Sequence, residues 1–447
     1  MADKILGKAP ISKLFIKYTI PAVLSMILAS SQTMIDGLFL GRFVGTNALA
    51  SVNIAAPYVQ IAMSVSMVLA FGALSILGRA LGASNYSRAQ NAFRTAFIML
   101  LAFGISYGCI GVFFTDQVAR QLGANLVLLG HVKSYIRVIA VFLPLFPLMI
   151  LTGFTSRIVG KPEAYLHATV GSLILNVFLD YVLIARLNMG MTGAALATGL
   201  SFALGAFLAV GPLFNKNASI NLYSGKWDKS LITNILYNGS SEGIGSASDA
   251  IATFIFNIEF MAYAGPEGVA AFTTISYLVR VGIMLSFGVA DGISPIVSYN
   301  YGSKQFDRVN DVMKYARRLC LGIGLIMLFV LFTKGQVLAS YFAKDNLKVI
   351  QMAGYGSKIY AFAFLFNSIN IIYSVYFTSL GKAGTSAIIA LSRGLIGVLV
   401  GIHVWKHFFG IAGVWLTIPA AEFITLGIVM VLVKRNALGR PQVAYQT

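Results

Sequence analysis

Seven carboxylates lie inside long apolar stretches of this 447-residue chain. A charged group in membrane hydrocarbon costs roughly 3 kcal/mol or more, so an acid retained there usually faces a cavity, a partner or an ion. Acids in such places bind metal cations, protons or organic cations. The seven are Asp36, Asp180, Glu242, Asp249, Glu259, Asp291 and Glu422.

The first polar group is built around Asp36 and Asp180. Each lies about five residues before the outer end of its apolar stretch, which is roughly 8 Å below the boundary at a helical rise of about 1.5 Å per residue. Asn176 precedes Asp180 by four residues and so shares its helix face, and Thr198 lies at nearly the same depth. We therefore predict that Asp36, Asn176, Asp180 and Thr198 form one cation-binding pocket.

The predicted pocket offers only oxygen ligands. Two carboxylates, an amide oxygen and a hydroxyl suit a metal ion such as Na⁺, and two carboxylates can also share a proton. Asn176 and Thr198 by themselves are equally explained as hydrogen-bonding contacts between helices. Both H⁺ and Na⁺ therefore stay open as the bound ion.

A second polar group is predicted in the later half of the chain. Glu242 and Asp249 lie seven residues apart on one helix and share a face, with Asp291, Asn367 and Asn370 as possible partners. Acids in this arrangement attract organic cations. We predict that these five residues line a substrate cavity.

The elements that carry these residues are predicted to be membrane helices. With 57% hydrophobic residues, 11% charged residues and a mean hydropathy of +0.80, the chain has too little polar surface for a water-soluble core of its size. Apolar runs long enough to cross a bilayer core of about 30 Å recur along it. We predict an all-α integral membrane protein with about twelve spans, at residues 14–40, 52–77, 92–114, 134–155, 165–185, 192–214, 231–264, 269–297, 319–332, 354–380, 385–405 and 411–433.

The formal charge of +18 is distributed unevenly among the loops. Basic residues gather before the first predicted span and after the second, sixth and eighth, so that roughly 22 lie on one side and about 11 on the other or in outer helix halves. The positive-inside rule makes the richer side cytoplasmic, with both termini, and a nucleic-acid partner becomes unnecessary. We expect a multi-pass protein of the cell inner (plasma) membrane whose first span is an uncleaved helix.

The chain also repeats itself at an offset of 220 residues. Residues 45–50 align with 265–270, 82–88 with 302–308, and 190–196 with 410–416. Six spans in each half is an even number, so the halves are parallel repeats about an axis along the membrane normal. We predict two six-helix lobes, 1–214 and 231–447, around a central cavity and joined by a cytoplasmic linker at 215–230.

The repeat provides a comparison for the first polar group. The counterparts of its four residues at +220 are all apolar: Phe256, Ile396, Val400 and Ile418. A cluster that served only the scaffold would be expected to keep some members in both halves. The one-sided distribution favours a functional role.

Motifs for enzymatic or ATP-driven chemistry are missing from the sequence. It has no Gly-x4-Gly-Lys-Ser/Thr phosphate loop, no His-Glu-x-x-His zinc motif and no Gly-x-Ser-x-Gly nucleophile elbow. We therefore expect neither an enzyme nor an ATPase. A structural role is as plausible as a functional one for four of the acids. Glu242 is as well explained by a place near the cytoplasmic mouth, and Glu259, Asp291 and Glu422 by solvation or structural pairing.

Several stretches resemble the multidrug and toxic compound extrusion (MATE) family. They are residues 21–50, with Asp36-Gly-Leu-Phe-Leu-Gly-Arg at their centre, the loop 81–88, Asn176-x-x-x-Asp180, and Ser298-Tyr-Asn-Tyr-Gly-Ser-Lys304. The similarity covers nearly the whole chain. It implies two six-helix lobes around a central cavity and exchange of a drug-like substrate for H⁺ or Na⁺.

The resemblance also implies roles for single residues. The first polar group matches the cation-binding residues of the family's archaeal and DinF-like bacterial branch, and Pro21 matches the proline at which the first helix bends there. Asp249 falls where the NorM-like branch carries a glutamate on helix 7. The tenth helix departs from that branch by holding Asn367 and Asn370 where an acid is expected, which leaves a cation site in the second half open.

The function implied by the resemblance is secondary active export of organic, mostly cationic, small molecules or drugs by antiport against H⁺ or Na⁺. We expect a monomer in contact with membrane lipid and no cofactor besides the coupling ion. Two alternatives stay open. A flippase for lipid-linked oligosaccharides of the same superfamily is expected to have about fourteen helices and a more cationic cavity, and an ion channel is expected to pass current without substrate.

Overall fold

The computed structural model of the chain describes residues 4–343 and 346–436, in which every regular element is a helix. The first half holds α1 (Lys4–Lys8), α2 (Ile11–Phe43), α3 (Thr46–Gly82), α4 (Tyr86–Phe113), α5 (Thr115–Gln121), α6 (Leu129–Phe142), α7 (Leu145–Ile158), α8 (Glu163–Leu179), the π-helix η1 (Asp180–Arg186), α9 (Gly190–Val210) and the 3₁₀-helix η2 (Gly211–Phe214). The second half holds α10 (Lys229–Gly302), α11 (Phe306–Phe342), α12 (Leu347–Tyr360), the 3₁₀-helix η3 (Ala361–Ala363), α13 (Phe364–Ser379), α14 (Ala383–Leu391), the π-helix η4 (Ser392–Ile396), α15 (Gly397–Phe409) and α16 (Ile411–Arg435). The all-α prediction is confirmed for these residues.

The number of membrane spans depends on the lengths of the helices, on the bend between α6 and α7 and on a break inside α10. Ten helices of the described chain are long and apolar enough to cross a membrane, and α6 with α7, bent by 44°, makes an eleventh span. The 74-residue α10 is broken at Ala264 and Gly265, where Gly265 has φ +62°. A Cβ on Gly268 would lie 2.3 Å from Phe260 O, so the chain folds back on itself there. Counted as two spans, α10 brings the described total to twelve.

Hydropathy placed the spans well but shortened several of them, and the ninth span most. The ninth span was predicted at 319–332, whereas α11 runs from Phe306 to Phe342. Its first turns carry charged residues, including Asp307 and Arg308, which an apolar window excludes. The helix therefore continues beyond its apolar part toward the side of the termini.

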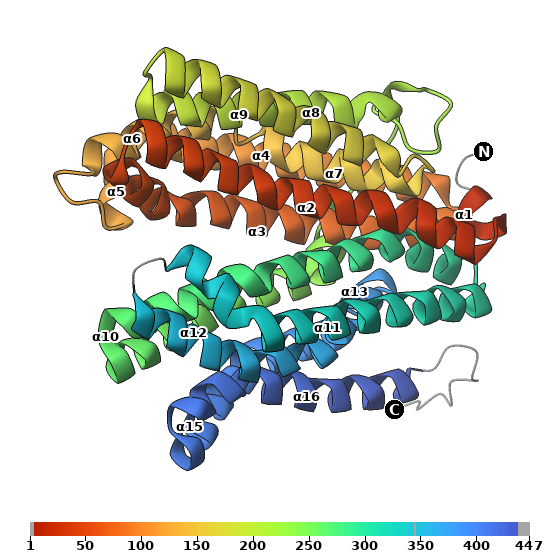
Figure 1. Ribbon diagram of the computed structural model, residues 1–447. Helices are drawn as coiled ribbons and strands as arrows, with labels where there is room; N and C mark the ends of the chain where they lie inside the picture. Colours follow the sequence, from red (N-terminus) through yellow and green to blue (C-terminus); the bar gives the residue numbers. More distant parts are fainter. Residues whose placement is uncertain (1–3, 344–345, 437–447) are drawn as a thin grey trace.

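Two helical bundles lie side by side in Figure 1. The elements α2 to α9, coloured red to yellow-green, form one bundle, and α10 to α16, coloured green to blue, form the other. The helix α1 and the end of α16 lie at the same end of the molecule. An even number of spans and a parallel repeat both require this.

The repeat is visible in the backbone itself. Ser84 and Lys304, which are 220 residues apart, both adopt positive φ angles, +60° and +59°. Gly190 and Gly410 do so as well, at +54° and +57°. A non-glycine residue at positive φ is uncommon, so the matched turns indicate that the two halves share one backbone plan.

The bundles touch most closely at the end that carries α1. A Cβ on Gly72 of α3 would lie 2.0 Å from Ile235 O, and one on Gly292 of α10 would lie 2.6 Å from Thr19 Cα, so backbones of opposite bundles meet there. In the described chain, the side-chain hydrogen bonds that join the bundles lie at the same end, from Ser75, Arg79, Asn300 and Arg308. The bundles are therefore closed against each other on the side of the termini.

The segment between the bundles is fastened to the first one. Residues 215–228 carry no helix, yet Gln90 Nε2 on α4 donates to Asn221 O at 2.6 Å and to Ser224 O at 3.0 Å. Gln90 Oε1 accepts from Asn221 N at 3.0 Å, and the backbone N of Asp228 donates to Thr95 Oγ1 at 3.1 Å. These bonds hold the predicted linker segment against α4.

Candidate functional site

The four residues of the first polar group meet in the first bundle. Asp36 lies on α2, Asn176 on α8, Asp180 at the first position of η1, and Thr198 on α9. Thr198 Oγ1 donates a hydrogen bond of 3.4 Å to Asp36 Oδ2, and Asp36 also interacts with the side chains of Asn176 and Asp180. The structure thus brings together side chains from three spans that the chain separates by up to 162 residues.

Burial differs between the two carboxylates. Asp180 and Asn176 are fully buried, whereas Asp36 is half-buried. Asp36 Oδ1, both carboxylate oxygens of Asp180 and both polar side-chain atoms of Asn176 are buried without a hydrogen-bond partner among the described residues. A buried polar atom without a partner costs about 1–3 kcal/mol, and a charged one costs more. A cation held by these oxygens would remove that penalty.

The ligand chemistry of this pocket suits a hard cation or a proton. Carboxylate, amide and hydroxyl oxygens are the ligands that hard cations prefer. In the part of the chain that the structure describes, neither Asp36 nor Asp180 has an ion-pair partner. Across residues 4–343 and 346–436, no three His, Cys, Asp or Glu side chains gather into a metal-ligand group. The four side chains offer two carboxylates, one amide oxygen and one hydroxyl as possible ligands.

Sequence reasoning missed three polar neighbours of the pocket. Tyr135 on α6 lies close enough to interact with both carboxylates. Gln32 Nε2 donates to Ser201 Oγ at 3.3 Å, and Ser201 Oγ donates to Thr198 O at 2.8 Å. Gln32 lies one helical turn before Asp36, a spacing that marks it as a member of the same face.

Each bundle contains a π-helix beside its polar group. The spans predicted at 165–185 and 385–405 are interrupted by η1, which begins at Asp180, and by η4, which contains Arg393. Short π-helical segments inside α-helices are frequent at functional sites because they re-aim nearby side chains. No pattern in the sequence predicts either segment.

Glu422 organises the polar group of the second bundle. Its Oε1 accepts hydrogen bonds from Asn367 Nδ2 at 2.6 Å and from Arg393 Nε at 3.1 Å, and its Oε2 accepts from Asn370 Nδ2 at 2.7 Å. Glu422 is buried and the Arg393 side chain is 17% exposed. Both amides are committed to Glu422 rather than to the acids of α10, which corrects the expected pairing.

The three acids predicted to line the cavity, all on α10, do not form one cluster. Asp249 is exposed and interacts with Arg393. Glu242 is half-buried and interacts with Asp291, which is itself buried in an ion pair with Arg157 of the first bundle. The predicted cavity lining therefore divides into two accessible acids, Glu242 and Asp249, and an acid that is paired across the bundles.

Two further residues singled out by the sequence lie outside these groups. Glu259 forms an ion pair with Lys406, one of the two roles left open for it. Pro21 lies inside α2, which runs without a break from Ile11 to Phe43, and Ser25 Oγ donates to Pro21 O at 2.8 Å. A bend of the first helix at Pro21 stays a prediction.

Comparison with known proteins places these features in context. The MatE family profile matches residues 21–182 and 244–402, one block in each bundle. The multidrug export protein MepA of Staphylococcus aureus (strain bovine RF122 / ET3-1) is 24% identical over 421 residues, which are 93% of this chain and 92% of that protein. MepA of Staphylococcus saprophyticus is 22% identical over 428 residues, 95% of this chain and 94% of that protein.

Solved structures share the fold at similar distance in sequence. An outward-facing multidrug resistance MATE family transporter of the MOP superfamily superposes with a TM-score of 0.90 at 22% identity, over 98% of both chains. A MOP superfamily transporter from Pyrococcus furiosus gives a TM-score of 0.90 at 21% identity, also over 98% of both chains. MATE in its bent conformation gives 0.89 at 20% identity over 97% of both. These matches show that the chain shares the fold of these transporters.

Proposed function

The chain belongs to the MatE family of membrane transporters, and from this premise we propose that it is a secondary active exporter that exchanges organic, mostly cationic, small molecules for H⁺ or Na⁺. Its relatives named above are multidrug export proteins, which supports a broad range of drug-like substrates. The accessible acids Glu242 and Asp249 support a preference for cationic compounds. The protein acts as a monomer in the plasma membrane.

The observation that carries the coupling proposal is the pair of carboxylates in the first bundle. Asp36 and Asp180 interact with each other, and three of their four oxygens are buried without a hydrogen-bond partner in the described chain. Two such groups cannot both stay charged and unpaired in a buried site. Binding of H⁺ or Na⁺ compensates the buried charge of Asp36 and Asp180. We therefore expect the binding of the ion to be coupled to the side of the membrane from which the site is accessible.

The order of events follows from which end is closed. In this proposal both termini are cytoplasmic, so the contact between the bundles near α1 closes the cytoplasmic side and the ion enters from outside. The half-buried Asp36 then meets the ion first, and the fully buried Asp180 completes its binding. Ion uptake from outside favours release of the cationic substrate, and reclosure carries the ion inward.

The driving force is the ion gradient. Moving one charge across 100 mV is worth roughly 2.3 kcal/mol, so one-for-one exchange of monovalent cations gains nothing from the membrane potential. A tenfold ion gradient contributes about 1.4 kcal/mol, which corresponds to a tenfold substrate gradient. At a tenfold ion gradient, export against a larger substrate gradient needs more than one ion for each substrate.

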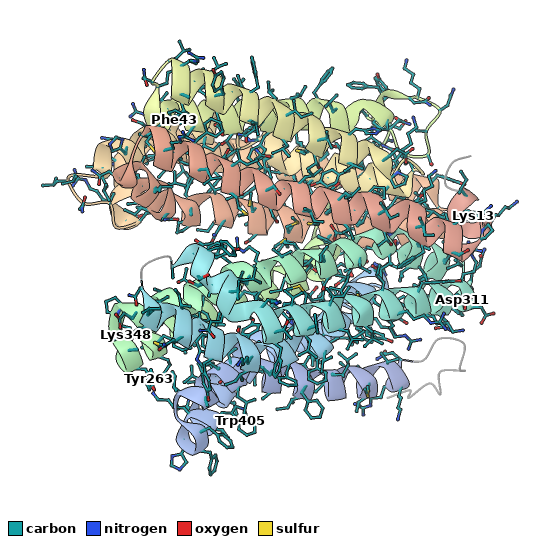
Figure 2. The ribbon with its side chains drawn as sticks, viewed as in Figure 1. Lys13, Phe43, Tyr263, Asp311, Lys348 and Trp405 are labelled. Atoms are coloured by element: carbon teal, nitrogen blue, oxygen red, sulfur yellow. The ribbon has the colours of Figure 1, made fainter. Side chains whose placement is uncertain are left out.

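Flux measurements in proteoliposomes test the proposal. Wild-type protein should move a fluorescent organic cation when a Na⁺ or a pH gradient is imposed, and the gradient that drives flux identifies the coupling ion. Asp36→Asn should abolish this flux at normal expression and unchanged thermal stability. Asp311→Asn is the matched control, because Asp311 is an exposed carboxylate near the termini (Figure 2).

Each alternative has its own signature in the same assay. Full flux by Asp36→Asn would contradict ion coupling at the carboxylate pair. Ion current without substrate would identify a channel, and movement of a lipid-linked oligosaccharide in place of the dye would identify a flippase.

A further inference from the structure

A buried ion pair joins the two bundles near their closed end. Arg157 lies in the last turn of α7 in the first bundle, and Asp291 lies in the second span of α10. Arg157 Nη1 is 3.6 Å from Asp291 Oδ2, and the two residues are 1% and 2% exposed. In the described chain, Arg157 Nε and Nη2 and both oxygens of Asp291 lack a hydrogen-bond partner. The pair is therefore fully buried but loosely held.

Such a pair is a poor device for joining the bundles. Burying two ions costs several kcal/mol for each, and the attraction between them balances this only when the geometry is close and the remaining hydrogen bonds are satisfied. Neither condition is met here. Well-packed apolar residues would hold the same contact at least as firmly.

The repeat shows that the equivalent contact is made without charge. Gly160 and Gly381 end the corresponding helices α7 and α13, with φ +90° and +77°. Aligning these glycines places Thr378 at the position of Arg157, and the 220-residue offset places Phe71 at the position of Asp291. Near these positions the bundles are joined by a neutral hydrogen bond, from Ser75 Oγ, one helical turn after Phe71, to Thr378 O at 2.6 Å. Closure of this end does not require an ion pair.

The surroundings of Arg157 are those of a site for an organic cation. Its guanidinium carbon lies 5.1 Å from the ring centre of Phe154 and 4.9 Å from that of Tyr165. Both rings belong to the first bundle and stay with Arg157, so in the closed state this cation has aromatic faces from its own bundle and the carboxylate of Asp291 from the other. Glu242, half-buried on the first span of α10, adds a second carboxylate that interacts with Asp291. When the bundles are closed near α1, the guanidinium of Arg157 occupies the position beside Asp291 that an organic cation would take.

We propose that Asp291 binds the cationic group of the substrate when the bundles are open to the cytoplasm, and that Arg157 is a resident cation that displaces the substrate when they close there. The proposal rests on the function proposed above. Because the two residues belong to different bundles, separation of the bundles removes Arg157 and leaves Asp291 and Glu242 free for a substrate. Closure of the bundles returns Arg157 to Asp291. Asp291 is therefore paired with the substrate when the bundles are open to the cytoplasm and with Arg157 when they are closed there, and the closing movement releases the substrate.

Binding and efflux of tetraphenylphosphonium, an organic monocation, test this assignment. Asp291→Asn should lower the binding affinity for this ion at least tenfold. Arg157→Gln removes the competitor, so binding should be as tight as in wild type or tighter while efflux slows at least tenfold. Ser75→Ala is the matched control, because it weakens the equivalent neutral contact and should leave binding unchanged.

A charge exchange separates this role from a structural one. The double variant Arg157→Asp with Asp291→Arg restores an ion pair, so it should recover the thermal stability of wild type but neither bind nor export the cation. Recovery of efflux by this variant, or wild-type affinity in Asp291→Asn, would overturn the proposal. Where Asp291→Asn fails to fold, Arg157→Gln decides, since weakened binding in that variant contradicts a resident competitor. The binding assay uses no ion gradient, so its result is independent of the flux assay that tests antiport.

Discussion

Gly82 and Gly302, which are 220 residues apart, each lie against the backbone of the opposite bundle. A Cβ on Gly82 would be 2.0 Å from Tyr299 O, and one on Gly302 would be 2.1 Å from Arg79 O. No side chain fits in that space, so the closed contact near the termini depends on glycine at both positions. The two close approaches are related by the repeat.

We expect Gly82→Leu to prevent closure at this end. The variant should fold, because the clash lies between the bundles, but its flux should fall at least tenfold. Labelling of Ser298→Cys, a buried position at the contact, by an impermeant maleimide should become faster from the cytoplasmic side. Gly427→Leu is the control, because a Cβ there meets nothing within 4 Å. Unchanged labelling and flux in Gly82→Leu would show that the contact is not part of the transport cycle.

Thr198→Val distinguishes the two candidate ions. The substitution keeps the shape of the side chain and removes the hydroxyl that lies 3.4 Å from Asp36 Oδ2. A Na⁺-coupled protein loses a ligand, and the half-saturating Na⁺ concentration should rise about ten- to a hundredfold, as expected for a lost contact to a charged group of about 1.5–3 kcal/mol. A proton-coupled protein should keep its pH-driven flux, since the two carboxylates carry the proton. Thr198→Ser should behave as wild type with either ion.

Removal of the charge on Glu422 should destabilise the second bundle. Glu422→Gln leaves the largely buried Arg393 without its carboxylate, which typically costs about 3–5 kcal/mol. Thermal unfolding in detergent should show a clear fall in Tm. The matched change Glu259→Gln breaks a more exposed pair with Lys406 and should cost about 1 kcal/mol or less. Equal Tm values for the two variants would contradict a stabilising role of Glu422.

Gln90→Ala should release the segment between the bundles. Three hydrogen bonds of Gln90 hold residues 221–224 against α4, and each unmade bond of a buried group costs about 1–3 kcal/mol. Trypsin should then cleave at Lys216 or Lys226 about ten times faster or more. Asn310→Ala, the exposed counterpart at +220, serves as the control. Unchanged cleavage would mean that other contacts hold the segment.

The sequence predicted the architecture because apolar length and the repeat are local properties. The twelve spans follow from apolar length and the two parallel halves from the repeat, and the similar depth of Asp36 and Asp180 along their helices placed the two carboxylates at one level. Pairings between helices far apart in the chain depend on how each helix is rotated about its axis, which depth does not determine. For this reason Glu422 with Arg393, and Arg157 with Asp291, were not predicted, and Asn367 and Asn370 were given the wrong partners.

The fastening of residues 215–228 to α4 limits how the two halves move. Asp228 donates its backbone N to Thr95 and accepts from Ser230 at the start of α10, so no slack chain separates the halves. A displacement of one half along the membrane normal, as in an elevator, would need several residues of free chain. A tilt about the junction at Asp228 needs none, and the covalent connection therefore favours a rocking movement.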